Sequence, residues 1–200
     1  MHPSEPAFEL FAEYRELHSQ DRVFDSDELR SLRFFAVDLA FHEGRTPEEE
    51  CGHVASWVIQ LRELEKFALR EGRLPRENNR LNRDGISEEE RILSQWSRDQ
   101  RRPKARIKHC RYQTLRLETV PGFVWSPLDS KWQAQFEAYF RFVDRFGAPA
   151  IRSRNPEESR IAAWAARQRL AHAKGKLTPA RVSALEATGR WVWTVTNPTR

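Results

Sequence analysis

The residues of this chain with the clearest chemical potential form a dense cationic run in its middle. Seven Lys or Arg residues lie within 14 positions, with Asp99 as the single acid and His109 beside them. They are Arg98, Arg101, Arg102, Lys104, Arg106, Lys108 and Arg111. Because such side chains neutralise phosphates and release counterions, the run predicts contact with a nucleic-acid backbone. The alternative interpretation is a solvated face between helices.

A second and sparser cationic set occupies the corresponding place further along the chain. It consists of Arg167, Arg169, Lys174, Lys176 and Arg181. If each set belongs to a helix-turn-helix arrangement, a third helix would face the major groove. Its candidate reading residues are Arg111, Gln113 and Arg116 in the first set and Arg181 and Ser183 in the second. Since so few side chains are available to read bases, we expect binding that is largely independent of sequence.

The two cationic sets belong to an internal repeat. Trp-x-x-x-Gln-Arg occurs at 96–101 and 164–169, and a Leu-Glu pair followed by an aromatic-Val-Trp triplet occurs at 117–125 and 185–193, all offset by 68 residues. At the front, Trp57 and Gly72 match Trp132 and Gly147 with an offset of 75, so the first copy holds 7 extra residues before Trp96. Repetition on this scale predicts small stacked or tandem modules.

Three helices per copy would position these residues. In the first copy we expect a helix ending at Gly72, one started by Ser87 with Glu90 as a capping box, and one over 110–119. In the second copy, helix starts are indicated at Ser126-Pro127, Asn155-Pro156 and Thr178-Pro179. Apolar residues at helical spacing, including Leu69 and Ile92, are predicted to face inward. No segment shows the alternation typical of strands, so the fold class expected is all-α.

The first 50 residues differ from the rest in charge. They hold 5 Lys/Arg and 13 Asp/Glu, a net charge of −8, whereas residues 51–200 hold 29 and 16, a net charge of +13. Helices are indicated over about 5–19 and from an N-cap at Ser26 to Gly44. A further start at Thr46-Pro47 resembles Thr178-Pro179, so a degenerate first repeat within 1–56 stays open. An acidic segment of this kind could compete with a polyanion for the basic repeats.

Tryptophans at fixed repeat positions indicate a structural core, although aromatic residues among arginines can also stack on unpaired bases. The predicted core residues are Trp57, Trp96, Trp125, Trp132, Trp164, Leu185 and Trp193. Gln100 and Gln168 follow one turn after a core Trp, which favours a hydrogen bond to backbone over ligand contact. The next residues, Arg101 and Arg169, are suited to a carboxylate or to a phosphate.

Enzymatic chemistry is not indicated. Cys51 and His53 lie far in sequence from His109 and Cys110 and lack paired Cys-x-x-Cys spacing, so we expect no metal site, no cofactor and no disulfide. Phosphate-cradling Gly-rich loops and nucleophile constellations are absent from the sequence. Neither a membrane-spanning run nor a secretory leader is visible, so we expect a cytoplasmic protein without membrane contact or small-molecule substrate.

The ordered pattern of Trp, helix, Gly, Trp-x-x-x-Gln-Arg and Leu followed by an aromatic pair resembles the helicase-associated domain, a module of tandem repeats often found in actinobacterial proteins. The resemblance implies three-helix bundles of homeodomain or Myb character and a role in binding nucleic acid. It covers about 57–195, which divides the chain into 1–56, a first repeat at 57–126, a second at 127–195 and a tail at 196–200.

Two functions follow as expectations. The first is a non-enzymatic module that binds DNA or RNA through basic ridges on the repeats. The second is an adaptor whose acidic segment and basic repeats bind a helicase, a nuclease or another protein. Salt dependence separates them, because counterion release makes nucleic-acid affinity fall steeply with salt.

Overall fold

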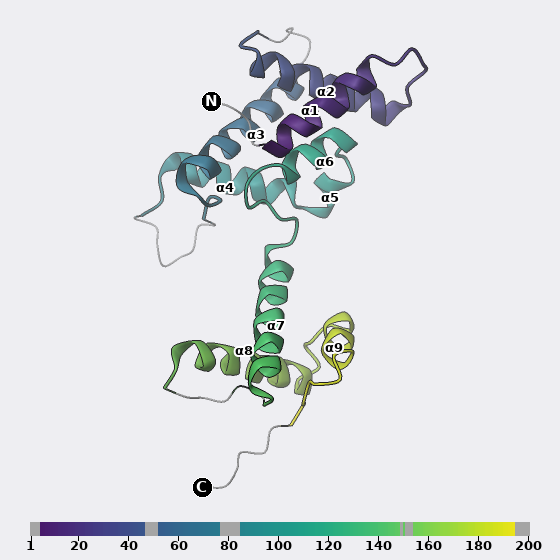
Figure 1. Cartoon of the computed structure of the whole chain (residues 1–200). Helices are drawn as coiled ribbons and strands as arrows, with labels where there is room; N and C mark the ends of the chain where they lie inside the picture. Colours follow the sequence, from purple (N-terminus) through teal and green to yellow (C-terminus); the bar gives the residue numbers. More distant parts are fainter. Residues whose placement is uncertain (1–4, 47–51, 77–84, 149, 151–153, 195–200) are drawn as a thin grey trace. The chain divides into compact units, whose positions relative to one another are not determined.

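A computed structural model describes residues 5–46, 52–76, 85–148, 150 and 154–194 (Figure 1). Within these ranges the chain forms nine helices and no strand, which confirms the all-α prediction. The chain divides into two compact units, Met1–Trp125 and Ser126–Arg200. The predicted helix start at Thr46-Pro47, Cys51 and the tail from 196 lie wholly or partly outside the described residues.

The described residues of the first unit form six helices. They are α1 (Glu5–His18), α2 (Ser26–His42), α3 (Gly52–Glu71), α4 (Glu88–Gln100), α5 (Pro103–Arg106) and α6 (Arg111–Glu118). The predicted cap at Ser26 is corrected by one residue, because Asp25 accepts hydrogen bonds from the backbone of Asp27 and Glu28 and Glu28 reciprocates. Pro103 begins the short α5, where its missing N–H costs nothing.

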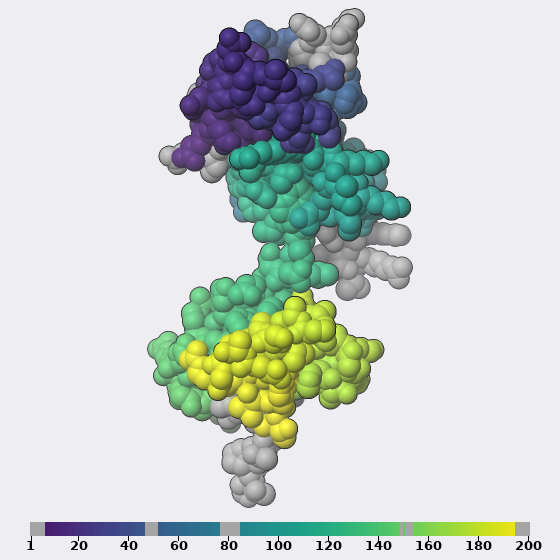
Figure 2. Space-filling model, turned by 90° about the vertical axis from the view of Figure 1, so that its right-hand side faces the viewer, coloured from purple at the N-terminus to yellow at the C-terminus, as the bar shows by residue number. Residues whose placement is uncertain are grey.

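The acidic segment is built into the first unit. Helices α1 and α2 share a core with α3 and α6 in which Phe11, Tyr14, Phe35, Val58 and Tyr112 are buried. The surface of the N-terminal helices adjoins the teal surface of the α5 and α6 region in Figure 2. This side of the first repeat is therefore not exposed to solvent, because α1 and α2 cover it.

A buried ion network fixes α2 against α3 and α6. Arg116 is 0% exposed, and its Nε donates to Asp38 at 2.8 Å while its Nη2 donates to Glu65 at 2.7 Å. The hydroxyl of Tyr112 also donates to Asp38, at 2.9 Å, and burial raises the pKa of Tyr112 well above its usual value. The proposed base or phosphate contact of Arg116 is therefore wrong, because its guanidinium is enclosed and neutralised.

The remaining core of the first repeat joins α3, α4 and α6 through Leu61, Leu64, Phe67, Leu93 and Leu117. Ile92 and Leu69 were expected to face inward but are exposed. Leu93 of α4 is buried and Trp96 packs against the core, as the apolar spacing predicts, and the small residues Ser94 and Ser97 complete the inward face. The prediction for α4 was therefore wrong for Ile92 alone.

In the second unit, the residues that the structure describes form three helices, α7 (Pro127–Phe146), α8 (Pro156–Ala173) and α9 (Pro179–Glu186). Ser126 and Asn155 cap α7 and α8 as predicted, while Thr178 precedes α9 without a side-chain cap bond. Gly147 ends α7 in the left-handed region at φ 67°, a conformation that favours glycine. The helices enclose a core of Tyr139, Phe140, Ile161, Trp164, Ala165 and Leu185.

Candidate nucleic-acid interface

The repeated Trp and Gln residues hold each repeat together by the same contact. The indole Nε1 of Trp57 donates to Gln100 Oε1 at 2.9 Å, and the indole Nε1 of Trp132 donates to Gln168 Oε1 at 2.9 Å. The predicted structural role is correct, but the partner that the two glutamines share is an indole, and backbone is bonded only by Gln168, whose Nε2 donates to the Trp164 carbonyl at 3.4 Å. The contact joins the first helix of each repeat to the second.

The arginine that follows each of these glutamines is committed to the fold in the same way. Arg101 Nε donates to the carbonyl of Val124 at 2.7 Å, and Arg169 Nε donates to the carbonyl of Val192 at 2.7 Å. Their guanidinium groups lie 4.7 Å and 4.8 Å from the centres of the Phe123 and Trp191 rings. Both arginines fasten the last segment of a repeat to its second helix, which leaves less of each group for phosphate.

The last Trp of each repeat completes the set of matched contacts. The indole of Trp125 donates to Glu118 at 2.6 Å, and the indole of Trp193 donates to Glu186 at 3.1 Å. Among the predicted core residues, Trp164 and Leu185 are buried. The others are half-buried and pack against the cores: Trp57, Trp96, Trp125, Trp132 and Trp193.

Several of the predicted phosphate contacts already have polar partners. Arg102 pairs with Asp99 at 3.2 Å, Arg111 with Glu13 at 3.5 Å and Arg181 with Asp129 at 2.7 Å. Arg98 donates to Gln95. Exposed ion pairs of this kind are weak and exchangeable, so they lower the local positive charge without preventing phosphate contact.

The other six predicted residues are exposed and have no carboxylate partner within the described part of the chain. They are Lys104, Arg106, Lys108, Arg167, Lys174 and Lys176. The first three lie on α5 and the link that follows it, and the last three lie at the end of α8 and just beyond it. Arg106 and Lys174, and likewise Lys108 and Lys176, are separated by the repeat offset of 68 residues. We call these four residues the matched cations.

His109 adds little charge to this surface near neutral pH. Its Nε2 lies 3.0 Å from Gln100 Oε1, and its ring is half-buried. Burial lowers the pKa of His109, and the positive charges of Arg106 and Arg30 lower it further. The positive potential of the first ridge therefore comes from Lys and Arg, which stay charged across the physiological range.

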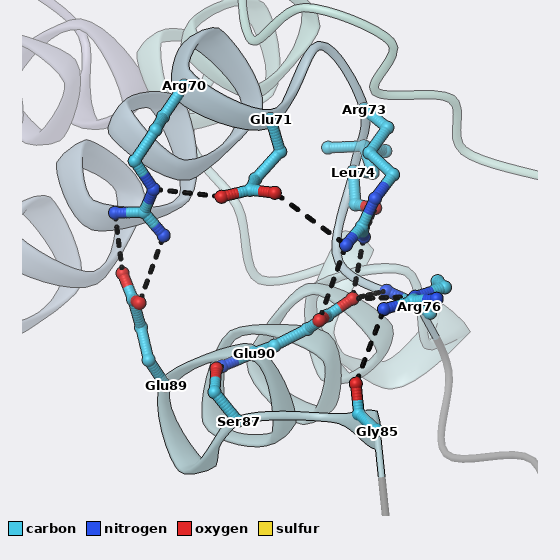
Figure 3. A network of polar contacts seen from close by, with 9 residues as sticks. All are labelled: Arg70, Glu71, Arg73, Leu74, Arg76, Gly85, Ser87, Glu89 and Glu90. Carbon is cyan, nitrogen blue, oxygen red and sulfur yellow. Dashed lines mark hydrogen bonds and ion pairs between the residues drawn. The ribbon is translucent and has the colours of Figure 1, made fainter. Parts of the chain in front are cut away.

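Sequence reasoning missed a second polar network, at the start of α4 (Figure 3). The carboxylate of Glu90 accepts from Arg73 Nη1 at 2.6 Å and from the backbone N–H of Arg76 at 2.8 Å. The hydrogen bond from Arg73, opposed by burial and helped by Arg76, lowers the pKa of Glu90 to about 2. Ser87 does cap α4, but Glu90 does not complete the predicted capping box because it turns to these arginines instead.

The Glu90 network pins the part of the first-repeat insertion that the structure describes. Arg70 of α3 also bonds Glu89 of α4 at 3.0 Å. An acid three positions after a Ser cap usually indicates a capping box. The sequence therefore pointed to a role for Glu90, but it did not distinguish a capping acid from a partner of arginines. The position of Arg73 and Arg76 beside Glu90 becomes visible only in the folded chain.

The described residues contain no candidate metal site. In the ranges that the structure describes, no three or more His, Cys, Asp or Glu residues are grouped so that they could hold an ion. Cys110 is buried as a free thiol. A search of the same residues finds no helix with the length and apolarity needed to cross a bilayer.

Comparison with known proteins supports the second repeat directly. Residues 129–194 match the family model of the helicase associated domain. This confirms the resemblance for that part of the chain, and the first repeat shares its Trp–Gln, Arg–carbonyl and Trp–Glu contacts. No curated protein and no solved structure gave a significant match.

Proposed function

We propose that this protein is a non-enzymatic module that binds DNA or RNA by contacting phosphates from both repeats. The observation that carries the proposal is the recurrence of the matched cations Arg106, Lys108, Lys174 and Lys176 at equivalent positions. All four are exposed. Lys and Arg side chains presented in this way add affinity for a polyanion through counterion release.

The proposal is distinguished from a merely solvated surface by the local imbalance of charge. Lys104, Arg106 and Lys108 lie within five positions, and none of the three has a carboxylate partner among the described residues. Like charges at this spacing repel one another, and a phosphate chain relieves that repulsion. The bonded arginines of the repeat signature instead hold the last segment of each repeat, at Val124 and Val192.

The contacts are expected to be largely independent of base sequence. Of the residues that a third helix would offer in the first repeat, Gln113 and Arg116 are buried, and Gln113 accepts from the backbone N–H of Cys110 at 3.1 Å. Arg111 remains exposed but is paired with Glu13. Since few side chains are left to reach base edges, the affinity rests on the nucleic-acid backbone.

Charge reversal tests the proposal. The double substitution Lys108→Glu with Lys176→Glu is expected to weaken binding to labelled single-stranded DNA, duplex DNA and RNA by about tenfold or more in fluorescence anisotropy, because it replaces two phosphate contacts by repulsions. The matched control is Lys66→Glu with Lys131→Glu, which makes the same change of charge at exposed positions of α3 and α7.

Equal losses in the two double variants would show that only net charge matters, and the matched cations would lose their role. If no nucleic acid binds, the protein-adaptor function becomes the better account. The acids of α1 and α2 give that account limited support, because Asp38 is buried and Asp25 caps α2.

A further inference from the structure

A cleft opens beside the cations of the first repeat. Its volume is about 380 Å³, and it is lined by Pro103, Arg106, Ile107, Thr114 and Trp125. Ile107 at its edge is 85% exposed, although the residues on both sides of it are cationic. A large apolar side chain exposed within a cationic ridge costs free energy in the unbound protein, and contact with an apolar surface on a bound ligand would recover it.

The Trp125 ring is held in a fixed orientation within this cleft. Its Nε1 donates to Glu118 at 2.6 Å, and Phe123 meets it edge-on at 5.1 Å with an interplanar angle of 90°. The guanidinium of Arg106 lies over the ring, 4.8 Å from its centre. Because Arg106 is exposed, its side chain is able to leave the ring for a phosphate at little cost.

The matching indole of the second repeat stacks on another ring. Trp193, the equivalent of Trp125, is stacked on the imidazole of His172 with ring centres 3.9 Å apart and an interplanar angle of 18°. The position equivalent to His172 in the first repeat is Lys104, separated by the offset of 68 residues. The indole of the second repeat therefore stacks on a flat heteroaromatic ring, whereas the first repeat has a cation at the corresponding sequence position, on the separate helix α5.

We propose that the cleft at Trp125 binds an unpaired nucleobase of a single-stranded nucleic acid. The base stacks on the indole where His172 stacks in the second repeat, Ile107 contacts its other side or edge, and Lys104 and Lys108 contact the flanking phosphates. A base inside a duplex is covered by its neighbours, so only single-stranded segments meet this requirement. The inference rests on the proposed function and specifies the form of nucleic acid that is preferred.

The test separates bases from phosphates. Affinity is measured by anisotropy for a labelled oligothymidylate and for an abasic oligomer of the same length and charge. The wild-type protein is expected to bind the oligothymidylate about fivefold or more tightly than the abasic oligomer, because each stacked base adds affinity. Ile107→Ser is expected to remove most of this difference and leave the abasic affinity unchanged. Val23→Ser, at a position that is 93% exposed in the first unit, is the matched control and should keep the difference.

A second variant gives the first repeat the histidine of the second. Lys104→His introduces the ring that the second repeat already has, so it is expected to reduce the preference for bases, while the abasic oligomer reports the loss of one charge. Photo-crosslinking of an oligomer that carries 5-bromodeoxyuridine locates the protein residues that contact the base. The expected adducts fall between residues 103 and 125.

The outcomes distinguish the two proposals. Equal binding of both oligomers by the wild-type protein would overturn base stacking and leave phosphate binding intact. Failure of both to bind would overturn both proposals. A base preference that survives in Ile107→Ser and Lys104→His, with adducts outside 103–125, would place the stacking site elsewhere and reject the cleft.

Discussion

At the scale of single residues, the repeat signature records a set of hydrogen bonds rather than a ligand site. Gln168 accepts from the Trp132 indole at 2.9 Å and donates to the Trp164 carbonyl at 3.4 Å, so one buried amide joins α7 to α8. Gln100 makes the equivalent bond to Trp57. Glutamine suits this place because it supplies both an acceptor and a donor without charge.

Replacing Gln168 by Ala should therefore destabilise the second unit by about 1–3 kcal/mol, because the half-buried indole of Trp132 loses its acceptor and a small cavity forms. Urea unfolding followed by circular dichroism measures the change. Gln133→Ala on the exposed face of α7 is the matched control, expected to stay within about 0.5 kcal/mol of wild type. Equal effects of the two substitutions would contradict a structural role for Gln168.

Spacing identified these positions, but it could not identify their partners. Trp57 and Gln100 are 43 residues apart, and periodicity within one helix carries no information about which side chain of another helix it meets. The buried state of Arg116 was also hidden, because its partner Asp38 lies 78 residues away in a segment outside the repeat. An arginine in a cationic run looks like a surface residue until its carboxylates are located.

At the scale of elements, helix starts and ends followed local chemistry and were predicted closely, whereas the insertion was not. Ser87 begins α4 and Gly147 ends α7 as the sequence indicated. The segment after α3 holds the extra residues of the first copy, and nothing in its sequence predicts that Arg73 and Arg76 tie its described part to Glu90 at the start of α4 (Figure 3). These hydrogen bonds and ion pairs join two elements, so the sequence of either element alone does not predict them.

The Glu90 network predicts an acid-sensitive contribution to stability. Folding lowers the pKa of this carboxyl from 4.5 to about 2, so the stabilisation is fully present above about pH 5 and is lost as the pH falls towards 2. Glu90→Gln should cost about 1–3 kcal/mol at pH 7, a range reduced because Arg73 and Arg76 are partly exposed. The deficit relative to wild type should shrink between about pH 4.5 and 2.

Urea unfolding at several pH values checks this dependence. Glu88→Gln provides the comparison, since Glu88 is an exposed acid of the same first turn that pairs with Arg91. Its effect should be small at every pH. A deficit in Glu90→Gln that stays constant down to pH 2 would show that the carboxylate charge has no stabilising role.

At the scale of the whole molecule, charge is divided differently from the way the sequence suggested. The acidic segment belongs to the first unit, so residues 1–125 hold 21 Lys/Arg and 23 Asp/Glu, a net charge of −2, and residues 126–200 hold 13 and 6, a net charge of +7. We therefore expect the second unit to dominate long-range attraction of a polyanion, while the first contributes a local ridge. The sequence showed an acidic first segment and a basic remainder, but only the fold showed that α1 and α2 share a core with the first repeat.

The division into two units predicts that a substitution that destabilises one core leaves the other core unaffected. Arg116→Met leaves Glu65 buried without this cation and leaves Asp38 with Arg62 as its cationic partner, at 3.1 Å, which should cost about 3–5 kcal/mol. Hydrogen exchange on the full chain should then show lost protection in α2, α3 and α6 and unchanged protection in α7 to α9. Arg111→Met, at an exposed position with a weak ion pair, is the control. Loss of protection in all helices would indicate one cooperative body instead.

The salt dependence of binding tests the central claim most directly. The logarithm of the affinity for a single-stranded oligomer should fall linearly with the logarithm of the salt concentration, and replacing all four matched cations by Gln should reduce the slope by about 0.7 for each phosphate contact removed. The account predicts a slope that is shallower by about 3 in the variant. A slope identical to that of the wild-type protein would contradict phosphate binding by Arg106, Lys108, Lys174 and Lys176.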